Sequence, residues 1–190
     1  MKPIPPLYIL RHGETEWNVQ GRLQGKFEST LTQKGIAQAE AQRAILAARD
    51  MSGFKALCSP QGRAQTTAQI ALDGIVSPIA TEPDLREIGL GLWAGKYRTD
   101  VMANSAARDG FDIYELAPDG EGFAALHRRC EKLLKTLETP CVLITHGITS
   151  RMLRLIVQGR PMDDLRDIQG GQGVVFYLAD GQQTRLTKDI

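Results

Sequence analysis

Two of the three histidines in this sequence stand at the end of an apolar run. His12 follows the run "LYIL" and an arginine, Arg11, whereas His146 follows "CVLIT", and a glycine comes directly after each histidine. A third apolar stretch, "FKALC", leads into a segment that contains Arg63. Imidazole can act as a nucleophile or a proton carrier, and the planar fork of arginine donates two parallel hydrogen bonds to phosphate. Together these residue types point to an anion site suited to phosphate chemistry.

Strand-like and helix-like patterns alternate along the chain and predict how these side chains are positioned. Short apolar runs predict strands at residues 7–11, 54–60, 77–85, 141–145 and 173–181. Helical spacing or Ala-rich composition predicts helices at residues 31–50, 62–74, 121–137 and 148–159. The alternation indicates an α/β fold with a mostly parallel central sheet. We expect residues 1–190 to form a single domain, because this length suits one domain.

The carboxyl ends of the strands are the usual place for a ligand in such a sheet. Arg11, His12 and His146 fall at predicted strand ends. Ser59 does so too, with Arg63 one helical turn later, so we expect these side chains to meet. Simpler readings stay open from these residues alone, since a single histidine after a strand is more often a core or surface residue. A two-histidine metal site is a further alternative. The adjacent Arg11 argues against it, because a cation beside a metal dication is unfavourable, and no third ligand recurs at ligand spacing.

Composition narrows the classes of partner. The chain has 23 basic and 22 acidic residues, so its net charge of +1 gives no electrostatic reason to expect nucleic acid or an anionic membrane. No apolar run approaches the ~20 residues of a membrane helix, and the N-terminal "MKPIPP" lacks the apolar core of a signal peptide. Cys58, Cys130 and Cys141 show no metal spacing, so we expect reduced, buried thiols in a cytoplasmic protein. A homodimer is expected only as the commonest oligomer.

Four motifs follow one another along most of the chain: "LRHGETEWN", "CSPQGRAQTTA", "LREIGLGLWAGK" and "VLITHGITSRML". Together they resemble the signature blocks of the histidine phosphatase superfamily, the phosphoglycerate mutase-like phosphatases. The resemblance implies the α/β fold of that family, in which helices flank a mostly parallel central sheet on both faces. Four blocks in order make the resemblance far more specific than a lone Arg-His-Gly.

The resemblance implies two catalytic residues. His12 would be the nucleophile that takes the phosphoryl group, and Glu87 would be the acid that protonates the leaving oxygen. Read without the resemblance, Glu87 is more simply a surface carboxylate paired with Arg86. Other acidic residues, Glu14 among them, also compete for the role of the acid.

Further positions would bind the substrate if the family's roles carry over. The phosphate oxygens would be held by Arg11, Arg63 and His146, with Asn18 in support from the first motif. Gln24 lies where the family's loop approaches the substrate. Neither a metal nor another cofactor is implied, because these donors can neutralise the phosphate by themselves.

The resemblance leaves more than one function open, since the family contains both phosphatases and mutases. The main interpretation is a phosphomonoesterase that hydrolyses small phosphorylated metabolites through a phosphohistidine. A phosphoglycerate-type phosphomutase is the first alternative, and a non-catalytic phosphate-binding or partner-binding module is the second. Residues 95–120 would form a small cap over the site. Residues 96–121 are net acidic, which argues against the basic insertion with which the family's mutases grip a doubly anionic substrate.

Overall fold

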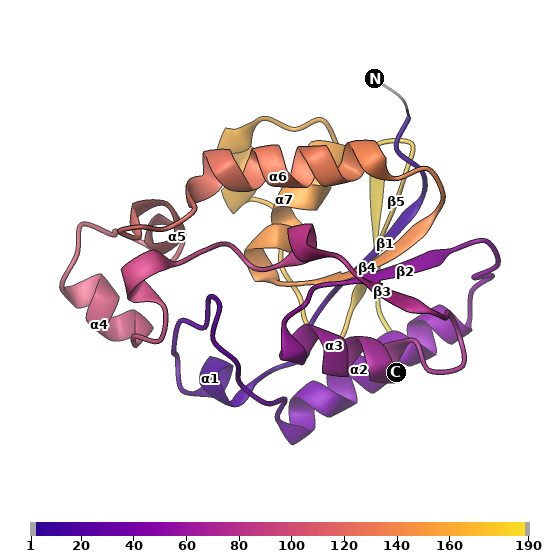
Figure 1. Ribbon diagram of the computed structural model, residues 1–190, viewed down its shortest axis with the longest axis horizontal. Coiled ribbons are helices and arrows are strands. Elements are labelled where there is room, and N and C mark those ends of the chain that lie inside the picture. Colours follow the sequence, from indigo (N-terminus) through magenta and orange to yellow (C-terminus); the bar gives the residue numbers. More distant parts are fainter. Residues whose placement is uncertain (1–2, 189–190) are drawn as a thin grey trace.

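The computed structural model of the protein describes residues 3–188, and these contain a six-stranded sheet (Figure 1). Its strands are β1 (Leu7–Arg11), β2 (Lys55–Cys58), β3 (Ile79–Thr81), β4 (Cys141–Thr145), β5 (Val175–Ala179) and β6 (Gln182–Leu186). The order across the sheet is β3-β2-β4-β1-β5-β6. β3, β2, β4 and β1 run parallel, whereas β5 and β6 pair antiparallel at one edge. The predicted α/β fold with a mostly parallel sheet is confirmed.

Strand β6 was not predicted from the sequence. The predicted last strand, residues 173–181, corresponds to β5, and "QQTRL" after it carries no apolar face because β6 is a largely exposed edge strand. Asp180 and Gly181 join the two strands, with φ angles of 51° and 73°. An Asp-Gly pair is the usual sequence of such a two-residue hairpin turn, so this dipeptide was the available signal.

Helices cover both faces of the sheet, as predicted (Figure 1). The longer helices are α2 (Gln33–Ala47) and α3 (Gly62–Ala71) on one face, and α6 (Gly122–Thr136) and α7 (Gly147–Val157) on the other. Shorter elements are α1 (Glu16–Val19), α4 (Arg98–Ala103), α5 (Asp112–Leu116), η1 (Pro83–Leu85), η2 (Gly91–Trp93) and η3 (Met162–Arg166). No helix within residues 3–188 has the length and apolar character needed to cross a membrane.

Strand β1 is buried on both faces, and this fixes where its carboxyl end lies. Leu7 and Ile9 pack into the core shared with α6 and α7, whereas Tyr8 and Leu10 pack into the core shared with α2 and α3. This alternation follows from the two-residue period of a strand. The amide of His12, directly after β1, donates to the carbonyl of Thr145 at the end of β4 (3.0 Å). Both predicted histidines therefore emerge at the same edge of the sheet.

Two glycines let the chain after His12 pass close to the start of α2. A Cβ atom on Gly13 would meet the carbonyl oxygen of Gly35 at 2.2 Å, and one on Gly35 would meet the carbonyl oxygen of Glu14 at 2.1 Å. Neither position has room for a side chain, because real Cβ atoms essentially never come that close. The backbone that carries His12 is thus seated directly against a long helix.

The three cysteines are buried and unpaired, as the sequence predicted. Burial raises the pKa of the Cys58 and Cys130 thiols to about 12. Such thiols are protonated at neutral pH and unreactive, so they act as small apolar side chains in the core.

Residues 95–120 contain α4 and α5, which lie away from the sheet on the same side of the molecule as α1 (Figure 1). This segment shares a small apolar core with the loops that precede it, formed by Leu23, Leu90, Val101, Ala107, Ile113 and Ala117. Arg22 ties the segment to the first motif. Its guanidinium donates to the carbonyl of Gly95 (2.9 and 3.1 Å) and lies 3.9 Å from the ring centroid of Trp17.

Candidate active site

A small polar cavity lies beyond the carboxyl ends of β1 and β2, with a volume of about 80 Å³. All of the predicted site residues except His146 line it, namely Arg11, His12, Asn18, Gln24, Arg63 and Glu87. Arg22, Leu23, Gly25, Arg98 and Tyr114 complete the lining. The ring of His146 lies next to that of His12, with centroids 5.1 Å apart. The structure therefore brings together residues that are far apart in the sequence.

His12 is held as a neutral imidazole, and one of its two nitrogens has no hydrogen-bond partner within residues 3–188. Its Nδ1 lies 2.7 Å from the carbonyl oxygen of Gly13, and because a carbonyl only accepts, Nδ1 must carry the proton. Nε2 then keeps its lone pair. Burial, followed by the charges of Arg11 and Arg63, lowers the pKa of His12 well below its usual value. A buried neutral imidazole with an unprotonated Nε2 beside two arginines is suited to nucleophilic attack on phosphorus.

His146 is fully buried and oriented by Ser59, which follows β2. The Nε2 of His146 lies 2.7 Å from the hydroxyl of Ser59, whereas its buried Nδ1 has no hydrogen-bond partner among the described residues. Burial, then Arg63 and His12, lowers the pKa of His146 well below the usual value. The serine hydroxyl can donate a hydrogen bond to Nε2. In that tautomer Nδ1 would carry the proton and could donate a hydrogen bond to an anion. Ser59 stood at a predicted strand end, but the sequence did not reveal this role.

The two arginines differ in how much of their donor capacity is already used. Arg63 donates from both terminal nitrogens to the loop after the first motif, at the carbonyls of Gly25 (3.0 Å) and Phe27 (2.9 Å). The Nε atoms of Arg63 and Arg11 are buried and have no partner among residues 3–188. Within the same residues, no carboxylate lies within 4.0 Å of either guanidinium. An anion would therefore meet two positive charges that have no close counterion.

Asn18 and Gln24 are both tied to Thr15 at the start of α1. Thr15 and Asn18 cap the helix reciprocally, and the amide nitrogen of Gln24 donates to the Thr15 hydroxyl (2.8 Å). Gln24 keeps a buried Oε1 with no partner in the described residues. The amide nitrogen of Gln24 carries two N–H groups and uses one of them on Thr15, so the other can donate to a phosphate. The Nδ2 of Asn18 donates no hydrogen bond within residues 3–188, so it is available as a donor as well.

Glu87 sits against the amino-terminal end of α7. Its carboxylate accepts hydrogen bonds from the amides of Ile148 (3.2 Å) and Thr149 (3.1 Å) and from the Thr149 hydroxyl (3.1 Å). A helix N-terminus provides free amides and a favourable dipole for such a carboxylate. Arg86 is not its partner, because Arg86 lies close to Asp84 and Glu121 instead. The simple surface pair considered from the sequence is therefore wrong.

A largely buried ion pair between Arg129 of α6 and Glu121, which directly precedes that helix, holds the loop that carries Glu87. Arg129 donates to the carbonyls of Asp84 (2.5 Å) and Arg86 (3.1 Å) and pairs with Glu121 (2.7 and 2.9 Å). Glu121 in turn accepts from the amide of Gly89 (3.1 Å). Burial works to raise the pKa of Glu121, but the bonds and charge of Arg129 outweigh it and lower that pKa. Sequence reasoning missed Arg129, since a charge on a helix does not reveal which loop it faces.

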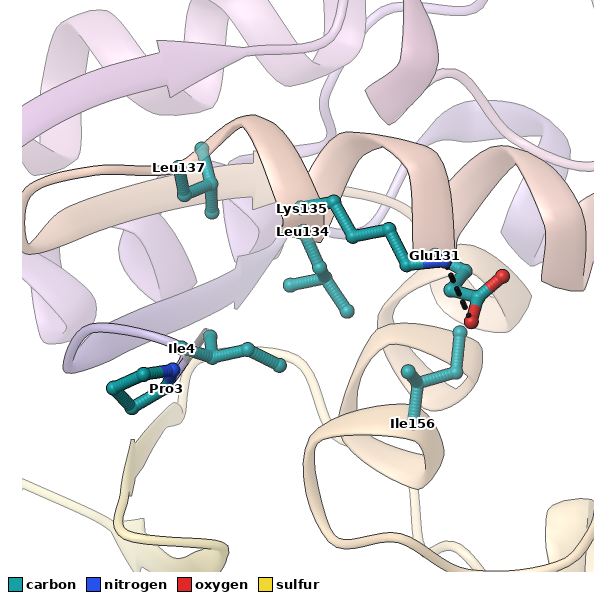
Figure 2. Close-up of a pocket in the computed structure, with 7 residues that line it drawn as sticks. All are labelled: Pro3, Ile4, Glu131, Leu134, Lys135, Leu137 and Ile156. Carbon is teal, nitrogen blue, oxygen red and sulfur yellow. Dashed lines mark ion pairs between the residues drawn. The ribbon is translucent and has the colours of Figure 1, made fainter. Parts of the chain in front are cut away.

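A larger apolar hollow of about 220 Å³ lies elsewhere, between α6, α7 and the start of the described chain (Figure 2). It is lined by Pro3, Ile4, Glu131, Leu134, Lys135, Leu137 and Ile156. Its two charged residues pair with each other at 3.0 Å. Apart from this ion pair its lining is apolar and contains neither a histidine nor an arginine, so the polar cavity is the better candidate for phosphate chemistry. Within residues 3–188, no cluster of three or more His, Cys, Asp or Glu is arranged to hold a metal ion.

The buried histidines lead to a prediction about pH and stability. An unfolded histidine has a pKa near 6.5, whereas burial holds the pKa values of His12 and His146 well below that. The unfolded state therefore binds more protons once the pH drops below about 6.5, so stability is present above that pH and is lost as the pH falls. Each histidine can remove up to about 2 kcal/mol between pH 7 and pH 5.

Urea denaturation at pH 7 and pH 5 would measure this loss of unfolding free energy. The control is the variant His12→Gln, in which only one of the two buried imidazoles remains, so the loss between the two pH values should be about half. An unfolding free energy that does not change between pH 7 and pH 5 would contradict the buried neutral state of both histidines.

Comparison with known proteins identifies the class of this protein. Residues 7–186 match the family model of the histidine phosphatase superfamily (branch 1), so the chain belongs to this superfamily, as its motifs predicted. Members of the family that resemble the chain are phosphatases or phosphoglycerate mutases. Their activities support the interpretation that this chain is an enzyme acting on phosphate esters.

Three individual proteins show how similar the chain is to known members of the family. The adenosylcobalamin/alpha-ribazole phosphatase of Salmonella typhimurium is 37% identical over 136 residues, which cover 70% of this chain and 66% of that protein. A probable phosphoglycerate mutase GpmB of an Enterobacter species is 32% identical over 82% of this chain and 75% of its own length. The crystal structure of the alpha-ribazole phosphatase from Shigella flexneri superposes with a TM-score of 0.81 at 28% identity, and covers 97% of this chain and 96% of that one. The matched segment thus spans just under two thirds of the Salmonella relative.

Proposed function

We propose that this protein is a phosphomonoesterase that works through a phosphohistidine at His12, in a single domain whose 95–120 segment acts as a cap. The observation that carries the proposal is the state of His12, a buried imidazole whose Nδ1 is committed to the Gly13 carbonyl and whose Nε2 is free. Phosphoryl transfer needs mainly positioning and charge neutralisation, and Arg11 and Arg63 provide charge beside this nitrogen without a metal ion.

In the first step, Nε2 of His12 forms a bond to phosphorus while the bond from phosphorus to the leaving oxygen breaks. The leaving oxygen takes the electron pair of that bond and a proton from Glu87, whose position beside the same cavity suits this role. Arg11, Arg63 and a proton on Nδ1 of His146 would hold the phosphate oxygens.

In the second step, water attacks the phosphorus of phosphohistidine and the bond from phosphorus to nitrogen breaks. Glu87, now a carboxylate, takes a proton from the attacking water, so the acid of the first step becomes the base of the second. His12 returns to its neutral form with Nδ1 still bonded to Gly13, and inorganic phosphate leaves. Each cycle restores every group to its starting protonation state.

The function is tested by assaying a panel of small phosphomonoesters for released phosphate, with and without EDTA. We expect hydrolysis that EDTA leaves unchanged. The panel includes 3-phosphoglycerate with a trace of 2,3-bisphosphoglycerate, since a phosphoglycerate mutase is among the relatives. Phosphate release without appreciable formation of 2-phosphoglycerate is expected.

Three results would count against this function. Fast isomerisation of 3-phosphoglycerate without phosphate release would make the protein a mutase, and loss of hydrolysis in EDTA would require a metal ion. No turnover of any ester in the panel, together with tight phosphate binding, would favour the non-catalytic binding module.

A further inference from the structure

A second cavity of about 250 Å³ adjoins the phosphate cavity. The two share the lining residues Arg11, Glu87, Arg98 and Tyr114. The second cavity continues from these toward Phe111 of the 95–120 segment and Arg151 of α7. Because Glu87 stands where the cavities meet, a phosphate bound near His12 would direct the rest of its ester into the second cavity.

The charge of this second cavity is positive. Three arginines line it, Arg11, Arg98 and Arg151, against the single carboxylate of Glu87. That carboxylate already accepts hydrogen bonds from the backbone of α7. Among the residues that the structure describes, no carboxylate lies within 4.0 Å of the guanidinium of Arg98 or Arg151.

The acidic residues of the 95–120 segment do not reach this cavity. Asp109 and Asp112 pair with Arg166, Asp112 also pairs with Arg108, and the carboxylate of Glu115 accepts from the amide of Phe123 (2.6 Å). None of these acids lines the second cavity. From the sequence, the net acidic composition of the segment argued against a second anionic group on the substrate. That composition does not describe the surface that a substrate would meet.

Arg151 presents the donor geometry that a carboxylate requires. Its Nε donates to the carbonyl of Ile168 (2.7 Å), and its guanidinium lies 5.3 Å from the ring centroid of Phe111. These contacts fix the side chain, and Nη1 and Nη2 donate no hydrogen bond within the described residues. Two adjacent N–H groups in a plane match the two oxygens of a carboxylate. Burial and the charge of Arg11 lower the pKa of Arg151, so an anion here would relieve an unfavourable charge.

Arg98 gives a second donor in the lining of the same cavity. Its Nη1 and Nη2 donate to the carbonyl of Gly110 (3.3 Å) and the hydroxyl of Tyr114 (3.0 Å), which holds the guanidinium at the cavity. Its Nε donates no hydrogen bond within residues 3–188. We propose that the preferred substrates carry a carboxylate on the leaving group, and that Arg151 binds this carboxylate with Arg98 in support. This proposal rests on the phosphomonoesterase function.

A matched pair of esters tests the proposal. 3-Phosphoglycerate and sn-glycerol 3-phosphate have the same three-carbon chain and differ in that a carboxylate replaces a hydroxymethyl group. Wild-type kcat/KM should be higher for 3-phosphoglycerate hydrolysis by about 10–100-fold, the range expected for hydrogen bonds to a charged group. Arg151→Gln should remove most of this preference by lowering kcat/KM for 3-phosphoglycerate, with about threefold or less change for sn-glycerol 3-phosphate.

Two further variants separate a specific contact from a general disturbance. Arg98→Gln should reduce the same preference by a smaller factor. Arg166→Gln is the matched control, because Arg166 also lies over the Phe111 ring (5.6 Å) but pairs with Asp109 and Asp112 and does not line the cavity. This control should keep the full preference. Hydrolysis of sn-glycerol 3-phosphate shows in each variant whether the fold and the phosphate site are intact.

The proposal is overturned if the wild type shows no preference between the two esters, or if Arg151→Gln and Arg166→Gln change it equally. An equal loss on both esters in Arg151→Gln also overturns it, since Arg151 would then support the fold or the phosphate instead. Failure of the phosphomonoesterase function gives a different result, because neither ester nor p-nitrophenyl phosphate would be hydrolysed by the wild type.

Discussion

Replacing His12 with alanine is expected to lower turnover by about 10⁴-fold or more while the protein stays folded. The imidazole is the proposed nucleophile, and loss of a nucleophile removes the covalent route that every substrate uses. His12 makes one side-chain hydrogen bond, to the adjacent Gly13 carbonyl, so the sheet and its two helical layers do not depend on it. Steady-state kinetics with p-nitrophenyl phosphate and a circular dichroism melt would measure both properties.

The chemical evidence for His12 comes from the intermediate. Wild-type enzyme quenched in mid-turnover with a ³²P-labelled ester should carry acid-labile, base-stable phosphate, and peptide mapping should place it on His12. His127, on α6, gives the matched control, because His127→Ala removes an imidazole that does not line the polar cavity. Turnover should be normal in His127→Ala. Label on a serine, or normal turnover in His12→Ala, would rule out the mechanism.

The sequence predicted the parts of the fold that carry a strong burial pattern. Residues 7–11 and 141–145 are apolar on both faces, which only a central strand allows, and the structure has strands with those bounds. The same runs placed Arg11, His12 and His146 at one edge of the sheet. β6 was not predicted because it is an exposed edge strand that buries no continuous face, so its sequence shows no alternation of apolar and polar residues.

Charged side chains were harder to predict, because their direction is set by packing. Arg86 and Glu87 are adjacent and of opposite charge, yet Glu87 turns to the amides at the start of α7 and Arg86 turns to other acids. Arg129 and Arg151 stand on helices where a solvated charge is the ordinary interpretation. Instead, Arg129 holds the loop that carries Glu87, and Arg151 lines the second cavity. A count of charges along a segment cannot reveal which of them face a substrate.

Replacing Glu87 with glutamine is expected to separate two substrates that differ in their leaving groups. The amide keeps the size of the side chain and one acceptor oxygen for the amides of Ile148 and Thr149, but it has no proton to give. A sugar alkoxide leaves poorly without a proton, so phosphorylation of His12 by a sugar phosphate should slow by about 10²–10⁴-fold. p-Nitrophenolate leaves well unaided, so phosphorylation by p-nitrophenyl phosphate should slow much less.

The second step supplies an independent signature of the same residue. Water attack on phosphohistidine would lose its base with either substrate, so Glu87→Gln should give a burst of p-nitrophenol about equal to the enzyme, followed by slow turnover. Rapid-quench kinetics would measure the burst. Glu14→Gln is the control, because Glu14 bonds to Lys34 and Thr32 outside the cavity, and it should behave like the wild type. If Glu87→Gln shows no burst and slows both substrates alike in the first step, Glu87 is not the acid. Glu121, which contacts the same loop through Gly89, would be the next carboxylate to test.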